Sequence, residues 1–109
     1  IEERLNKHFG DFEIRVIHAL PSHHVSEGSE LVTKLKEAYT EVTGKEAYCM
    51  SLGGAKYARG FENAVTFGPL FPGEPKLEHG PDEYIEIESF MMNAEIIANA
   101  IVKLCGLHT

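Results

Sequence analysis

His79 is the side chain in this sequence with the clearest potential for metal chemistry. It follows Gly68–Pro75, which holds three prolines and two glycines in eight residues, and it precedes Asp82 and Glu83. Prolines and glycines at this density exclude regular structure and predict a stiff, ordered loop. Neutral imidazole binds zinc when its second ring nitrogen is oriented by an acceptor, which either carboxylate could supply. A zinc site also needs further ligands, and no second cluster in the chain supplies them, so a structural histidine remains the alternative.

A glycine-rich loop is the second candidate site. Gly53 and Gly54 are followed closely by Tyr57 and Arg59. Paired glycines let backbone amides approach an anionic group, and a guanidinium can hold a carboxylate through two hydrogen bonds. The spacing matches neither a P-loop nor a dinucleotide-binding fingerprint. The loop is therefore either a carboxylate-binding site or a tight turn with solvated cations.

Two segments that could position these sites carry apolar residues at helical spacing. Over residues 31–42 this spacing predicts an amphipathic helix with Ser26 or Ser29 as its N-cap and Gly44 at its end. Over residues 90–105 a wider apolar stripe predicts a second helix, packed against the rest of the fold.

Four shorter segments have the apolar pattern of β-strands, namely residues 12–20, 47–52, 64–67 and 84–87. The order of strands and helices predicts an α/β fold, a mixed sheet with flanking helices. Because so few elements make a thin layer, part of the sheet would need cover from further chain or from a second subunit, as in a homodimer.

Charge and composition exclude several classes of function. The chain has 17 acidic and 10 basic side chains, a formal net charge of -7, which opposes recognition of a nucleic-acid backbone. No apolar run approaches the roughly 20 residues of a membrane-spanning helix, and no signal-peptide pattern is present. We expect neither nucleic-acid nor membrane partners. Because the first residue is Ile1 rather than Met, we also expect the sequence to begin within a longer protein.

The two cysteines, Cys49 and Cys105, are far apart and lack the spacing of a zinc finger or a disulfide framework. This pattern indicates a reducing, cytoplasmic setting. Both have apolar neighbours, so we expect each to be a small, buried hydrophobic residue.

Several motifs together resemble the M20 metallopeptidase family, and within it the PepV-like bacterial dipeptidases. The resemblance is carried by residues 53–59, 63–74 and 79–87, and it extends through residues 30–32 and 39–44. It implies a two-domain enzyme with two zinc ions on an α/β catalytic domain and a smaller lid domain. Residues 1–20 would then be the end of the lid domain or a connecting strand, and residues 21–109 the C-terminal part of the catalytic domain.

The resemblance also implies roles for the candidate residues. His79 would be the last zinc ligand, and the substrate's C-terminal end would lie against the glycine-rich loop, at Gly53, Gly54, Tyr57 and Arg59. Lys56 departs from the small hydroxyl residue common in the family at this position. The general base and the other ligands would lie outside this chain, which contains no catalytic residue.

The function implied by the resemblance is hydrolysis of dipeptides through a metal-activated water. This chain would contribute the C-terminal segment, would contact the remainder of the catalytic domain and the lid, and would be inactive in isolation. The alternative is a non-catalytic α/β binding or interaction module derived from the same scaffold.

Overall fold

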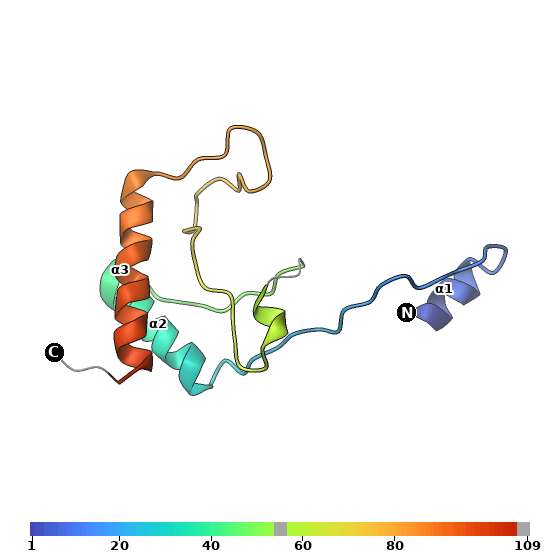
Figure 1. Cartoon of the computed structure of the whole chain (residues 1–109), viewed down its shortest axis with the longest axis horizontal. Helices are drawn as coiled ribbons and strands as arrows, with labels where there is room; N and C mark the ends of the chain where they lie inside the picture. Colours follow the sequence, from blue (N-terminus) through green and yellow to red (C-terminus); the bar gives the residue numbers. More distant parts are fainter. Residues whose placement is uncertain (54–56, 107–109) are drawn as a thin grey trace.

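Helical segments joined by long extended stretches make up the part of the chain that is described, residues 1–53 and 57–106 of a computed structural model. Figure 1 shows the arrangement: α2 and α3 lie against each other, and α1 stands away from them at the end of an extended arm. The elements in chain order are α1 (Glu2–His8), α2 (Glu30–Thr43), the short 3-10 helix η1 (Tyr57–Gly60) and α3 (Ile87–Leu104).

The two helices predicted from apolar spacing are confirmed, and local chemistry explains where α2 begins and ends. The side chain of Ser29 accepts a hydrogen bond from the amide of Val32 at 3.3 Å, as an N-cap does. At the other end Gly44 has a φ of 71°, the left-handed conformation that ends many helices. The second helix, α3, begins three residues earlier than its apolar stripe, at Ile87.

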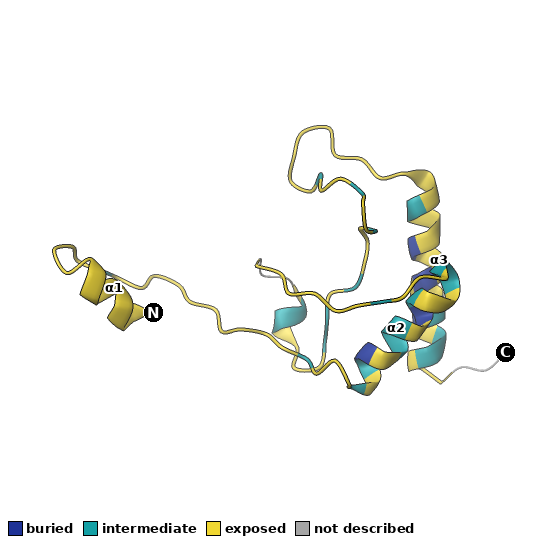
Figure 2. Ribbon diagram, turned by 180° about the vertical axis from the view of Figure 1, so that it is seen from behind, coloured by how far each residue is buried: buried dark blue, intermediate teal, exposed yellow. Residues whose placement is uncertain are grey.

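The small hydrophobic core lies between α2 and α3 (Figure 2). Its buried residues are Val32 and Ala38 from α2 and Ile96 and Ala100 from α3. Ala38 is completely inaccessible to solvent. Two of these four residues are alanines, and their short side chains favour a close approach of the two helices.

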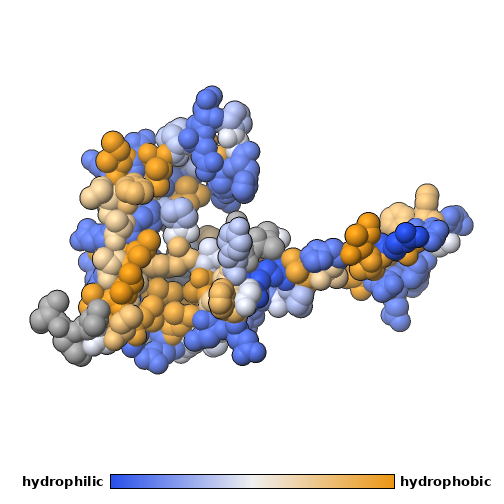
Figure 3. Space-filling view, in the orientation of Figure 1, coloured by the Kyte–Doolittle hydropathy of each residue, from blue (hydrophilic) through white to orange (hydrophobic). Residues whose placement is uncertain are grey.

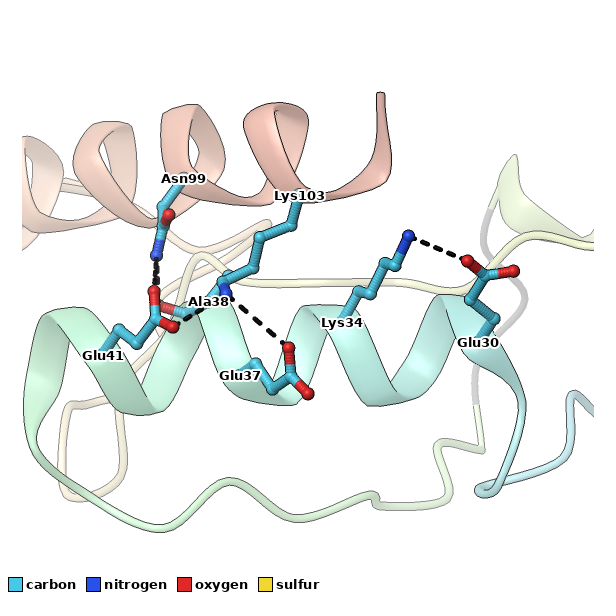
Figure 4. A network of polar contacts seen from close by, with 7 residues as sticks. All are labelled: Glu30, Lys34, Glu37, Ala38, Glu41, Asn99 and Lys103. Atoms are coloured by element: carbon cyan, nitrogen blue, oxygen red, sulfur yellow. Dashed lines mark hydrogen bonds and ion pairs between the residues drawn. The ribbon is translucent and has the colours of Figure 1, made fainter. Parts of the chain in front are cut away.

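A polar network links α2 and α3 beside this core (Figure 4). The ammonium group of Lys103 lies 2.7 Å from Glu41 and 3.6 Å from Glu37, and the amide of Asn99 donates to Glu41 at 2.8 Å. Hydrogen bonds from Asn99 and Lys103 lower the pKa of Glu41, and the hydrogen bond to Glu41 raises the pKa of Lys103. Each charged group therefore favours the ionised form of its partner.

The predicted mixed sheet is wrong: the described residues form helices and irregular segments, with no strand among them. Residues 12–20, 47–52 and 64–67 run without a ladder of backbone hydrogen bonds, and Ile87 belongs to α3 instead of a strand. The physical reason is that a strand satisfies its amides and carbonyls only through a neighbouring strand, whereas a helix does so internally. Alternating apolar residues indicate which side chains can be buried, but they do not provide the neighbouring strand that must pair with the segment.

The shape of the chain reflects this lack of pairing. Its radius of gyration is 18.7 Å, whereas a compact domain of this length has about 13 Å. Its accessible surface is 9448 Å², against about 6,000 Å² for a compact protein of the same mass. Extended segments and one small helix pair thus leave much of the surface uncovered.

Apolar side chains are part of that uncovered surface. Figure 3 shows apolar surface along α3 and over the neighbouring centre of the molecule, and Phe90, Ile97 and Ile101 are among the exposed residues of α3. The two cysteines, expected to be buried, are both exposed and unpaired, because the segments around them have no layer packed over them. None of the described helices is long and apolar enough to cross a membrane.

Candidate functional site

His79 lies on a turn whose backbone has an uncommon conformation. The amide of Gly80 donates to the carbonyl of Leu77 at 3.1 Å, and His79 and Asp82 have φ angles of 63° and 56°. Side chains other than glycine seldom adopt this left-handed region, and such residues concentrate at functional sites. The imidazole is exposed. The turn therefore presents His79 to solvent on a backbone of constrained conformation.

The loop before His79 is held on α3 by side-chain hydrogen bonds. Asn93, which is buried, donates to the carbonyl of Pro69 at 2.6 Å and to that of Ser89 at 2.9 Å. The carboxylate of Glu74 accepts from the Phe71 amide at 3.0 Å and from the Ser89 hydroxyl. The hydrogen bond from Ser89, followed by that from Phe71, lowers the pKa of Glu74. These contacts give the ordered loop that its prolines and glycines predict.

Two further contacts show why particular residues are needed in this loop. Gly68 has a φ of 70°, and a β-carbon at this position would lie 3.0 Å from the side-chain oxygen of Asn93. Glycine is therefore favoured by conformation and by space. The ring of Phe71 stacks on Tyr39 of α2, with centroids 6.4 Å apart. The loop is thus attached to both long helices.

The residues that hold the loop were not singled out in the sequence. Glu74 is one of many acidic residues, and Ser89 has no distinctive neighbours. Asn93 did carry a usable signal, because it is an amide near the apolar stripe of a predicted helix. A polar side chain in such a position is retained when it has hydrogen-bond partners to satisfy.

The glycine-rich loop is described only in part. Gly53 is exposed, with open space where a β-carbon would stand, while Gly54 lies outside the described residues. Tyr57 begins η1 and is 99% exposed. Arg59, in the same short helix, has one guanidinium nitrogen, Nη2, that is buried without a hydrogen-bond partner among the described residues.

This guanidinium nitrogen is a local electrostatic feature of the site. A buried cationic donor that lacks an acceptor is costly, because desolvation is not offset by a hydrogen bond. A carboxylate would provide the acceptor, and it would do so with a charge of the opposite sign. The charge of the guanidinium is therefore compatible with the carboxylate-binding alternative for this loop, although Nη2 itself is closed to solvent in this conformation.

The structure does not bring the two candidate sites together. Figure 1 shows η1 near the start of α2, whereas the orange loop that bears His79 lies near the start of α3. Two surface depressions, lined mainly by polar side chains of α2, include neither Arg59 nor His79. The two sites are therefore separate features of this chain.

As a metal centre, the His79 turn is incomplete within the described residues, which contain no group of three His, Cys, Asp or Glu side chains able to hold an ion. Its imidazole has the donor chemistry that zinc prefers, so the turn fits the role of one ligand among several. The structure places no hydrogen bond between the His79 ring and Asp82 or Glu83, and orientation of the ring by either carboxylate stays a prediction.

Comparison with known proteins adds the family relationship. The family model "Peptidase family M20/M25/M40" matches residues 4–103. The Bacillus subtilis (strain 168) protein named "Putative dipeptidase YtjP" is 42% identical over 94 residues, which are 86% of this chain and 20% of that protein. The Staphylococcus aureus (strain USA300) protein named "Putative dipeptidase SAUSA300_1697" is 32% identical over 94 residues, which are again 86% of this chain and 20% of that protein. This chain thus spans about a fifth of the length of these relatives. No solved structure matches.

Proposed function

Because the chain belongs to peptidase family M20/M25/M40, we propose that it forms the C-terminal segment of a zinc-dependent dipeptidase. The observation that carries this proposal is the extent of the likeness, since 86% of the chain aligns with a protein named as a dipeptidase at 42% identity. The candidate residues His79 and Arg59 both lie within the matched range. The proposed substrate class is taken from the names of the relatives, and the proposed zinc dependence is what the resemblance to M20 metallopeptidases implies; the imidazole of His79 is compatible with it.

The large accessible surface supports a role as part of a larger domain. A chain with 9448 Å² of surface and exposed apolar residues along α3 is suited to pack against further protein. We assign that role to the remainder of the catalytic domain and the lid, with a second copy of the chain as a possible additional partner. The exposed, unpaired cysteines fit a reducing, cytoplasmic setting.

In this proposal His79 is a zinc ligand that acts from a constrained turn. The chemistry that bound zinc supplies in such enzymes is polarisation of the peptide carbonyl and activation of water. His79 contributes an imidazole donor, and its left-handed backbone conformation sets the direction in which its side chain leaves the turn. The remaining ligands and the general base are assigned to the rest of the enzyme.

Arg59 is assigned to the C-terminal carboxylate of the dipeptide. A substrate carboxylate would pair with the guanidinium of Arg59, whose Nη2 has no acceptor among the described residues. Gly53 and Gly54 would let backbone approach the substrate closely, and Tyr57 would present its exposed ring beside it. Recognition of a free C-terminus is a useful property for an enzyme that selects short peptides.

The decisive experiment is His79→Ala in the intact protein. We expect dipeptide hydrolysis to be lost and bound zinc, measured by elemental analysis, to fall below that of the unaltered enzyme. The matched control is His18→Ala, because His18 is also exposed and lies on the extended arm. Full hydrolysis by the His79 variant would refute the ligand assignment. A protein that hydrolyses no dipeptide even when unaltered would instead favour the non-catalytic interaction module.

A further inference from the structure

The segment between Glu74 and α3 carries His79, and two side chains join its ends. One is Glu74, which immediately precedes the segment, and the other is Ser89, 15 positions later in the first turn of α3. The Ser89 hydroxyl donates to one carboxylate oxygen of Glu74, and the other oxygen accepts from the Phe71 amide at 3.0 Å. Both side chains are partly shielded from water. The two ends of the loop are therefore joined by one carboxylate that is itself held in place.

Asn93 fixes this junction from the helix side. One turn beyond Ser89, its buried amide donates to the Ser89 carbonyl at 2.9 Å and to the Pro69 carbonyl at 2.6 Å. Between Glu74 and α3, in contrast, the described backbone has a single hydrogen bond of its own, from Gly80 to Leu77. The path of this segment thus depends mainly on how its ends are held, as in compact surface loops whose ends are close.

We propose that Glu74 and Ser89 form a clasp that positions the turn of His79, with Asn93 holding the clasp on α3. This inference rests on the proposed function, in which His79 binds zinc. Glu74 and Ser89 are positioning residues, because they reach the metal site only through the backbone of the loop. The carboxylate of Glu74 also lies near the N-terminus of an 18-residue helix, where negative charge is favoured.

Limited digestion with trypsin tests the clasp independently of metal binding. Lys76 is the only lysine or arginine between Arg59 and Lys103, and it is exposed within the loop. In the intact protein under native conditions, we expect Glu74→Ala to raise the rate of cleavage after Lys76 by about tenfold, because the loop opens more often.

The matched control is Glu95→Ala, an exposed glutamate of α3 without an ion pair in the described structure. Ser89→Ala should behave like Glu74→Ala, and Ser89→Thr, which keeps the hydroxyl, should restore slow cleavage. Equal rates in the Glu74 and Glu95 variants, including no cleavage in either, would overturn the clasp.

Zinc affinity tests whether the clasp positions His79. By competition with a chelator, Glu74→Ala should bind zinc about tenfold more weakly than Glu95→Ala, in line with other residues that support metal ligands. A purely structural role would lower the melting temperature but leave the zinc affinity of the folded enzyme unchanged, and that result would overturn the positioning role.

His79→Ala separates the clasp from the proposed zinc-ligand role of His79. If this variant keeps full zinc affinity, the ligand assignment fails, and the clasp is then supported or overturned by cleavage at Lys76 alone.

Discussion

The α2–α3 pair and the segments that carry the candidate sites differ in how they satisfy their backbones. The helices form their own hydrogen bonds, bury Ala38 and Ala100 against each other, and are linked by Lys103 and Glu41. The loops around Arg59 and His79 depend on a few side-chain contacts and expose most of their residues. This contrast indicates that the helix pair provides the stability of the chain while the candidate sites lie in other segments, so substitutions should separate their effects on stability and activity.

The largest difference between the effect on activity and the effect on stability is expected at Arg59, where substitution should lower activity and leave folding intact. In the intact protein, Arg59→Ala should lower kcat/KM for a dipeptide by about 10- to 100-fold, since a charged hydrogen bond to the substrate carboxylate is lost. Thermal stability should be unchanged or slightly higher, because a buried guanidinium nitrogen without an acceptor is removed. The discriminating measurement compares each dipeptide with its C-terminal amide. The unaltered enzyme should prefer the free acid, and a preference that survives in the Arg59 variant would exclude this contact.

The second effect is a loss of stability, and it is expected from substitutions in the α2–α3 pair rather than at the candidate sites. Ala38→Leu places a larger side chain at a position with no accessible surface, and overpacking of this kind costs about 1–3 kcal/mol. The control is Glu95→Leu on α3, because Glu95 is an exposed charged residue outside the apolar stripe, and this change should alter stability by less than about 0.5 kcal/mol. Urea unfolding of the intact protein measures both. Equal stability of the two variants would mean that α2 and α3 do not form the core.

A smaller effect is expected from pH, through Glu41. Its pKa is lowered in the folded state from 4.5, so its stabilising contribution is complete above pH 4.5 and is lost as the pH falls through the lowered value. Replacing Glu41 with Gln should therefore flatten the decline in melting temperature between about pH 6 and pH 3. An unchanged slope would show that the carboxylate is not held by Asn99 and Lys103. Lys103 affects stability at high pH instead. Its pKa is raised from 10.5, so its stabilising charge is complete below pH 10.5 and is lost as the pH rises through the raised value.

The smallest effect is expected from Lys103→Met, which removes the ion pairs to Glu37 and Glu41 but keeps most of the side-chain length. Because ion pairs that water still reaches contribute little to stability, and Lys103 is only partly buried, the melting temperature should fall by no more than about 2 °C. Lys45→Met, at an exposed lysine without an ion pair in the described structure, is the control. A large drop in the Lys103 variant alone would place much more of the stability in the polar network than its exposure suggests.

The candidate residues could be read from the sequence, but their surroundings could not. The prolines and glycines before His79 predict a stiff loop, and the structure confirms that Pro69 and Phe71 are held in place. The partners that hold them, Ser89 and Asn93, come from a helix that begins well after the loop. Pairing between such distant residues depends on how the chain folds back, and spacing alone carries no information about it.

The sequence by itself determined the two long helices, the C-cap of α2 and the family, and it limited the N-cap of α2 to Ser26 or Ser29, because helices and motifs depend on residues close together in the chain. Ser29, Gly44 and the apolar stripes act locally, so their effects were predictable. The tertiary structure decided whether the extended segments pair into a sheet, what Arg59 and His79 lie near, and which residues hold the loop. Strand pairing, burial and loop closure require a partner from elsewhere, and the described residues provide one for α2 and α3 but not for the predicted strands.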